Sequence, residues 1–204
     1  DLITVYLSIE VVSLMSFILA GYLKNNPRSN EASLKYVIYG AFSSGIMLYG
    51  LSIIFGLTGT TKFFAIRDAI TTLDASSSLA LTLSTVFVLA GFGYKISAVP
   101  FHFWTPDVYE GSPTPITAYL SVAPKAAGFA LMIRFFNQVF IDGDSLSTIG
   151  WYADVSFAWP ELLGVISVVT MTLGNLVAIQ QNSVKRMLAY SSIAHAGYML
   201  MAFP

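Results

Sequence analysis

The chain has 204 residues, of which 55% are hydrophobic and only 10% are charged, whereas an ordinary soluble domain carries roughly 25% charged residues. Ten Lys and Arg with eleven Asp and Glu cannot cover the surface of a soluble protein of this size, so the composition predicts lipid as the main solvent. The net charge of −1 argues against a general attraction to nucleic acid. The lack of cysteine excludes a disulfide framework and a thiolate metal site.

Six apolar runs follow one another along the chain, each near the length of about 20 residues that a spanning helix needs. They cover residues 2–22, 36–57, 75–94, 116–133, 162–184 and 187–204. We therefore expect an all-α fold, a polytopic transmembrane helix bundle of about six spans.

Polar segments at residues 25–33, 141–145 and 180–186 are predicted to connect these spans. If alternate connections lie on opposite sides of the membrane, one side collects more basic residues than the other, and the positive-inside rule makes that side cytoplasmic. The basic residues on this side are Lys24, Arg28, Lys35, Lys185 and Arg186. Aromatic residues near the predicted span ends, where interfacial side chains are expected, are Tyr49, Tyr109, Trp151, Tyr152 and Trp159.

Three ionisable residues, Glu10, Lys95 and Lys125, fall inside the predicted spans. Each costs roughly 2.5–3.5 kcal/mol at a helix centre, and such residues usually face the bundle interior. One interpretation is a static ion pair between Glu10 and a lysine, although two lysines and one carboxylate leave a cation unpaired. The other is a switch, because burial makes a lysine release its proton more readily and a nearby carboxylate opposes that release. We therefore expect Glu10 and Lys95 on adjacent helices, close enough for their charges to interact.

Two prolines lie beside the two lysines. Pro100 has no N–H and its ring clashes with the carbonyl of Ile96, so the third span is predicted to be discontinuous just past Lys95. Interrupted helices are tolerated where they line an enclosed cavity, and transporters place coupling-ion sites at such breaks. Pro124 is likewise expected to free the carbonyl of Leu120, one turn before Lys125.

Two histidines, His102 and His195, lie beyond the predicted break and within the sixth run. Each is either a packing residue or a relay between a buried lysine and water. Haem ligation is disfavoured, because His102 lies beyond the break and the chain has no second pair of histidines. The sequence also lacks a Gly-rich phosphate loop and an HExxH motif, so nucleotide, flavin or metal chemistry is not placed in this chain.

Three stretches carry a family resemblance. YKISAVPFHFWTPDVYEGSPTP (94–115), SVAPKAAGFALMIRFF (121–136) and QQNSVKRMLAYSSIAHAGYM (180–199) resemble the antiporter-like subunit N of proton-pumping NADH:quinone oxidoreductase, respiratory complex I. The resemblance covers essentially the whole chain and implies an internal piece of an inverted-repeat, antiporter-like fold. Residues 1–140 would form most of the first repeat with four spans, and residues 141–204 the start of the second with two.

The resemblance also implies roles for the ionisable residues. Lys95 matches the pump lysine on the broken helix, Glu10 the glutamate that modulates it, and Lys125 the lysine that passes protons on toward the centre of the subunit. His102 and His195 match histidines beside the broken helix and on a later helix. All five would serve proton translocation.

The implied function is that of a proton-translocating subunit of a translocase, with no redox chemistry and no cofactor or metal in this chain. FMN, iron–sulfur clusters and quinone would lie on partner subunits, and the partners would be other membrane-arm subunits, including sister antiporter-like subunits, and the lipid bilayer. The implied location is the bacterial inner membrane, with the mitochondrial inner membrane or the thylakoid membrane as alternatives. Two other functions remain open: an Mrp-type cation/proton antiporter subunit and a non-pumping membrane-arm scaffold.

Overall fold

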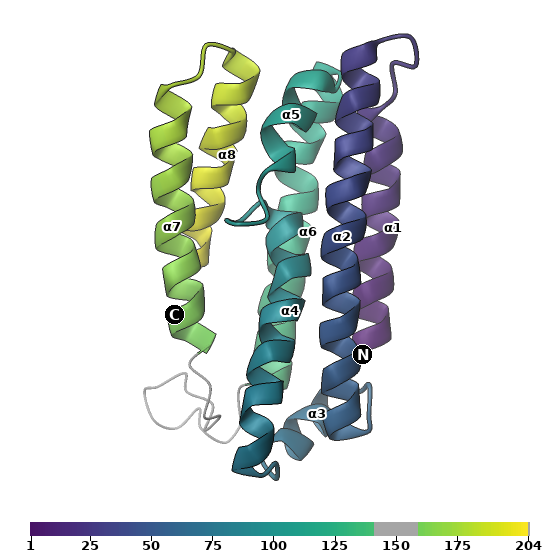
Figure 1. Cartoon of the computed structure of the whole chain (residues 1–204), viewed down its shortest axis with the longest axis vertical. Helices are drawn as coiled ribbons and strands as arrows, with labels where there is room; N and C mark the ends of the chain where they lie inside the picture. Colours follow the sequence, from purple (N-terminus) through teal and green to yellow (C-terminus); the bar gives the residue numbers. More distant parts are fainter. Residues whose placement is uncertain (141–158, 204) are drawn as a thin grey trace.

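The computed structural model describes residues 1–140 and 159–203, and the described part is built from helices that run mostly along one axis (Figure 1). In chain order they are α1 (Leu2–Ala20), α2 (Pro27–Thr58), α3 (Phe63–Ile70), the 3-10 turn η1 (Ala75–Ser77), α4 (Ser78–Ile96), α5 (Trp104–Gly111), α6 (Thr114–Val139), α7 (Trp159–Ile179) and α8 (Val184–Leu200). Five of the described helices, α1, α2, α4, α6 and α7, are long and apolar enough to cross a membrane. The sixth predicted span is a helix of 17 residues, α8.

Two of the predicted connections are wrong in their bounds. The segment 25–33 is mostly helical, because the Asn26 side chain caps α2 and Pro27 occupies its first turn. The segment 180–186 is shorter than predicted, because α7 ends at Ile179 and α8 begins at Val184. Lys185 and Arg186 therefore lie in the first turn of α8. The predicted turn at 141–145 and the aromatics Trp151 and Tyr152 lie outside the described residues.

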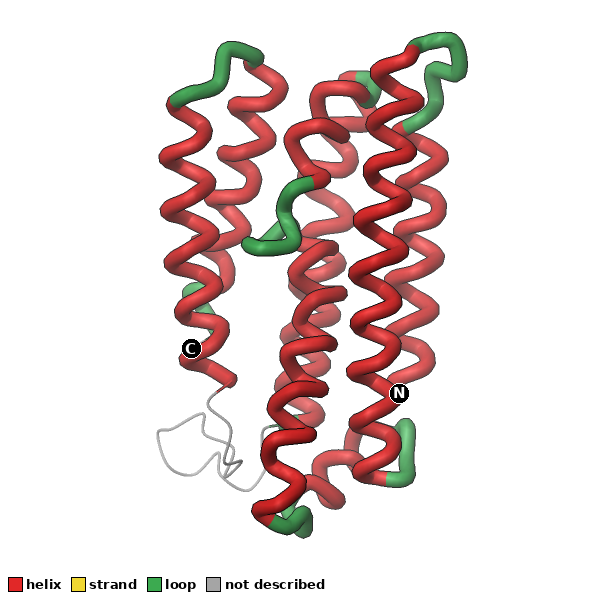
Figure 2. The backbone as a smooth tube through the Cα atoms, viewed as in Figure 1, coloured by secondary structure: helices red, strands yellow, loops and turns green. Residues whose placement is uncertain are grey.

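Two short helices, α3 and α5, are absent from the sequence prediction (Figure 2). Two of the predicted interfacial aromatics also lie elsewhere: Tyr109 on α5 is 1% exposed and Trp159 at the start of α7 is 4% exposed. Both are packing residues between helices, and only Tyr49 of the described set is exposed. Apolar sequence around an aromatic residue therefore did not distinguish a membrane interface from a helix–helix contact.

The helices form two antiparallel pairs, α1 with α2 and α7 with α8, on either side of α4 and α6 (Figure 1). The connections α1–α2 and α7–α8 lie at the same end of the bundle as α5 (Figure 1). This end carries the basic residues that the sequence placed on one side. Large apolar side chains such as Ile18, Phe42 and Val165 are more than half exposed on the outer helices, as expected for a surface that faces acyl chains.

The pair α7–α8 packs closely through small residues. The Ser167 hydroxyl donates to the carbonyl of Gly197 at 2.7 Å, and a Cβ on Gly197 would lie 2.6 Å from the amide nitrogen of Met171. Close packing through small residues is typical of helix association in membranes, where burial of apolar surface gives little driving force. The break after α4 therefore packs against a closely joined pair of helices, α7 and α8.

Candidate functional site

The interruption of the third span lies where the sequence predicts it. Helix α4 ends at Ile96, and Ser97 adopts a left-handed conformation with φ 65°. The amides of Ser97 and Ala98 close the helix end by donating to the carbonyls of Tyr94 and Gly93. The chain resumes helical structure only at Trp104, so Lys95 is in the last turn of α4, next to the break.

The break is fixed by contacts from three helices. The amide of Val99 donates to the Thr170 hydroxyl of α7 at 3.0 Å, and the indole Nε1 of Trp104 donates to the Tyr94 carbonyl of α4 at 3.0 Å. The ring of Tyr36, on α2, stacks on Trp104 with 4.3 Å between centroids. Backbone groups freed by the break are thus bonded to side chains, as an interrupted helix at membrane depth requires.

Lys95 faces protein, with 4% of its surface exposed. Its ammonium donates to the Ser13 hydroxyl of α1 at 3.1 Å, and that hydroxyl donates in turn to the Ile9 carbonyl at 2.7 Å. Gly128 of α6 lies against the lysine stem, because a Cβ on Gly128 would be 3.2 Å from Lys95 Cγ. The lysine is therefore held between α1 and α6 by a neutral acceptor.

Glu10 lies one turn before Ser13 on α1 and is half-buried. The ion pairs among the described residues do not include one between Glu10 and Lys95. Instead Glu10 lines a groove between α1 and α2 together with Tyr6 and Ser33. The directly bonded static pair considered from the sequence is therefore not present, and an interaction between the two charges stays a prediction.

Lys125, on α6, is 3% exposed. Its ammonium donates to the hydroxyl of Ser192 at 2.7 Å and to the carbonyl of Ser192 at 3.2 Å, and it lies 5.8 Å from the centre of the Tyr109 ring. The Tyr109 hydroxyl donates to the Leu120 carbonyl at 3.4 Å. Pro124 leaves that carbonyl free, as the sequence predicts, but it does so inside a continuous α6.

The two histidines are not brought to the lysines. His102 is 4% exposed, packs on Phe103, and leaves its Nδ1 without a hydrogen-bond partner among the described residues. The buried hydroxyls of Ser97 and Thr105, in or beside the break, likewise have no hydrogen-bond partner among the described residues. Buried polar groups of this kind are commonly satisfied by water. His195 lies on the exposed face of α8 against Tyr198.

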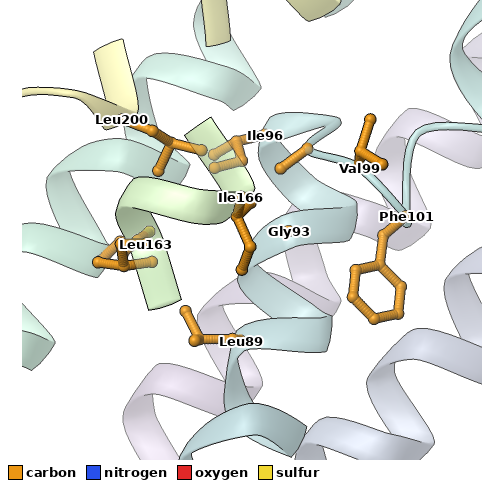
Figure 3. A pocket seen from close by; sticks show the side chains of 10 residues that line it. Leu89, Gly93, Ile96, Val99, Phe101, Leu163, Ile166 and Leu200 are labelled. Carbon is orange, nitrogen blue, oxygen red and sulfur yellow. The ribbon is translucent and has the colours of Figure 1, made fainter. Parts of the chain in front are cut away.

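The opposite side of the break is apolar. A cavity of about 20 Å³ separates Gly93, Ile96 and Val99 from Leu163 and Ile166 of α7 (Figure 3). It is large enough for one water, but a cavity lined by apolar side chains stays dry. The hydroxyl that Lys95 contacts comes from α1, whereas the cavity between the break and α7 is lined by apolar side chains.

An ion-pair cluster that was not predicted from the sequence anchors α5. Asp107 accepts from Lys35 of α2 at 2.7 Å and from Arg186 of α8 at 2.5 Å, and Arg186 also reaches Glu110 at 3.1 Å. Lys185 donates to the carbonyl of Ser112 at 2.8 Å. The only available signal was two acids three residues apart on α5, with no indication of which bases they would meet.

Within the residues that the structure describes, no group of three or more His, Asp or Glu side chains could hold a metal ion. The site contains two buried amines, Lys95 and Lys125. Each is bonded to a serine and each lies beside an irregularity in its helix.

Comparison with known proteins gives one consistent family. Residues 1–204 match the family described as NADH:quinone oxidoreductase/Mrp antiporter, transmembrane. The chain is 57% identical over 201 residues to NADH-quinone oxidoreductase subunit N 2 of Chloroherpeton thalassium, covering 98% of this chain and 38% of that protein. The chain thus spans about two-fifths of the length of this relative.

Two solved structures share the fold. A chain of respiratory complex I from Thermus thermophilus superposes with a TM-score of 0.78 and 35% identity, covering 99% of this chain and 40% of that one. A chain of the Mrp complex from Dietzia sp. superposes with a TM-score of 0.80 and 25% identity, covering 100% of this chain and 35% of that one.

Proposed function

The chain belongs to the NADH:quinone oxidoreductase/Mrp antiporter transmembrane family, and we propose that it forms part of a subunit N that moves protons across a membrane while quinone is reduced elsewhere in the complex. The 57% identity to a subunit N favours this function within the family. FMN, iron–sulfur clusters and quinone would lie on other subunits. The neighbours of this chain would be sister antiporter-like subunits and lipid, in a bacterial inner membrane.

The observation that carries the proposal is the environment of Lys95. A lysine used only as a structural charge would be paired with a carboxylate, whereas Lys95 is bonded to the neutral hydroxyl of Ser13 at the end of a broken helix. Its charge therefore depends on how strongly Glu10 acts on it. A carboxylate ~6 Å away is worth roughly 3 kcal/mol at an effective dielectric constant of ~20, comparable with the ~2.3 kcal/mol that one charge gains per 100 mV.

Lys125 would be the next residue along the proton path after Lys95. Gly128 lies one turn beyond Lys125 on α6 and contacts the stem of Lys95 from α4. Lys125 and the stem of Lys95 therefore lie along the same face of α6. A proton on one lysine disfavours a proton on the other by charge repulsion. Loading Lys95 would thus help Lys125 to pass its proton on. The buried polar atoms of His102, Ser97 and Thr105 would bind water beside the break.

The inverted-repeat division is part of the same proposal. Residues 1–140 would hold α1 to α6, most of the first repeat, and residues 141–204 would begin the second repeat with α7 and α8. The similar TM-score to the Mrp complex, 0.80 against 0.78 for complex I, keeps a cation/proton antiporter as the second candidate. The two candidates differ in partners, because hydrophilic iron–sulfur subunits would co-purify with a subunit N and not with an antiporter.

The test replaces Lys95 in the full-length subunit within its complex. Lys95→Met keeps the apolar stem and removes the titrating group, so the complex should assemble while proton pumping coupled to NADH oxidation falls. Lys95→Arg should fail as well, because a guanidinium stays protonated. The matched control is Lys62→Met, which removes an exposed lysine outside the membrane helices.

Assembly is checked on native gels and pumping in inverted membrane vesicles. Loss of pumping in both Lys95 variants with normal assembly supports the proposal. Pumping of Lys95→Arg at the wild-type rate would show that Lys95 is a fixed charge and would favour the scaffold alternative.

A further inference from the structure

Lys125 is buried and has no acid bonded to it. By contrast, the partly exposed Lys35 is paired with Glu31 and Asp107. The ion pairs of residues 1–140 and 159–203 include none with Lys125. An ammonium buried to this extent still needs groups that replace its hydration.

Three groups surround the ammonium instead. Two are oxygen atoms of the same residue, the hydroxyl and the carbonyl of Ser192 on α8. The third is the face of the Tyr109 ring on α5. A cation within about 6 Å of an aromatic centroid is attracted by the ring, and the attraction is strongest where water is excluded. Oxygen lone pairs and a ring face together form a neutral cation site.

The hydrogen bonds around this site have a defined direction. An ammonium has only donors, so Lys125 donates and Ser192 accepts. The Tyr109 hydroxyl uses its proton on the Leu120 carbonyl, which leaves its oxygen to accept from Ser192 across 3.5 Å. The chain of donors therefore runs from Lys125 through Ser192 and Tyr109 to Leu120.

The end of this chain depends on Pro124. In a regular helix the Leu120 carbonyl would accept the amide of residue 124, and proline has no N–H to give. The carbonyl is free to take the Tyr109 hydroxyl, and so the proline beside Lys125 completes the lysine's own hydrogen-bond chain.

We propose that Ser192 and Tyr109 are positioning residues that stabilise the protonated form of Lys125. They take the role that a carboxylate usually has beside a buried lysine. This proposal rests on the function proposed above. It also gives α5, the second half of the broken helix, a direct effect on Lys125, because a shift of α5 would carry the ring of Tyr109 away from the ammonium. The position of the half-helix and the charge of the lysine are then linked.

The groups that face Lys125 come from three helices. Helix α5 presents Tyr109, and α8 presents Ser192, which does not titrate in the accessible range. From α4, the stem of Lys95 lies against Gly128, which is one turn beyond Lys125 on α6. Removal of Ser192 or Tyr109 therefore changes the stability of the charged lysine without removing an acid or a base that titrates near neutral pH.

The experiment measures the pH dependence of proton pumping by the full complex in vesicles. A protonated Lys125 that has lost a stabilising partner releases its proton at lower pH, so the alkaline limb of the profile should move to lower pH. Ser192→Ala should move it by about one to two pH units, from the loss of a hydrogen bond to a charged group. Tyr109→Leu should move it by about one pH unit, from the loss of the ring.

Conservative variants separate positioning from packing. Ser192→Thr keeps the hydroxyl and should restore the wild-type profile, and Tyr109→Phe keeps the ring face and should move the limb less than Tyr109→Leu. Matched controls are Ser191→Ala, the adjacent serine of α8, and Tyr119→Leu, an exposed tyrosine of α6. Neither control should move the profile.

Lys125→Met distinguishes the two proposals. If Lys125→Met pumps like the wild type, the proposed role of this lysine in pumping fails. If Lys125→Met loses pumping while Ser192→Ala and Tyr109→Leu keep the wild-type profile, only the positioning role is overturned. Equal shifts for Tyr109→Phe and Tyr109→Leu would overturn the contribution of the ring.

Discussion

The indole nitrogen of Trp104 donates to the carbonyl oxygen of Tyr94 across the break, at 3.0 Å. Trp104 is the first residue of α5 and Tyr94 lies in the last turn of α4. One side chain thus bonds the two halves of the interrupted helix to each other. The same ring stacks on Tyr36 of α2, so the joint is also tied to the neighbouring helix.

Trp104→Phe should weaken this joint while keeping a ring on Tyr36. The variant leaves the Tyr94 carbonyl without its indole donor, and a buried acceptor that loses its partner costs about 1–3 kcal/mol. We expect a lower midpoint of thermal unfolding for the purified complex and a normal level of assembly. An unchanged midpoint would show that the Tyr94 carbonyl does not need this donor.

Ser13→Ala should reduce pumping without loss of assembly. The substitution removes the hydroxyl that accepts from Lys95, so the charged lysine loses about 1.5–3 kcal/mol of stabilisation. Ser16→Ala is the matched control, because Ser16 is a buried serine of the same helix whose hydroxyl donates to Val12. Equal rates for the two variants would mean that the bond to Ser13 does not affect pumping.

Gly128→Ala should disturb Lys95 through its stem. The added Cβ would lie 3.1 Å from Ile96 Cγ2 and 3.2 Å from Lys95 Cγ, so α4 or the lysine has to shift by a few tenths of an ångström. We expect assembly with reduced pumping, measured in vesicles. Gly45→Ala is the control, because its Cβ would meet nothing within 4 Å and it gains the same helix propensity of about 1 kcal/mol. Identical rates for both would contradict a tight contact.

Asp107→Asn should loosen α5 from α2 and α8. The variant removes the charge shared by Lys35 and Arg186, and because these side chains are about one-third exposed we expect a loss of only about 1–3 kcal/mol. Thermal unfolding of the complex measures it, with Asp68→Asn as the control on an exposed acid. A double-mutant cycle with Arg186→Met should show coupling, and strict additivity would show that the two residues act independently.

Much of the fold could be predicted from local properties of the sequence. Apolar runs locate the helices, and Pro100 locates the break beside Lys95, because both effects act within a few residues. The free carbonyl of Leu120 was predicted for the same reason. Helix α5 could not be predicted from its own eight residues, since it is held by contacts with α2 and α8 that lie far away in the sequence.

The partners of the lysines were outside the reach of sequence reasoning. Ser13 and Ser192 are common residues, and their role arises from a contact between helices that are far apart in the chain. His195 was the residue of α8 predicted to have a functional role, yet it is Ser192, three residues earlier, that contacts Lys125. A helix presents one face to its neighbour, and the sequence of an apolar helix with no amphipathic pattern does not indicate which face that is.

The contact between Lys125 and Ser192 limits how the protein can be recombined. The proposed boundary after residue 140 separates the lysine from its serine, so the two proposed repeats would not be interchangeable modules. A chimera that takes residues 1–140 from one relative and the rest from another would keep a working site only if the donor of the second part brings an oxygen acceptor to this position. Compatibility between parents should therefore depend on one side chain of α8 more than on overall identity.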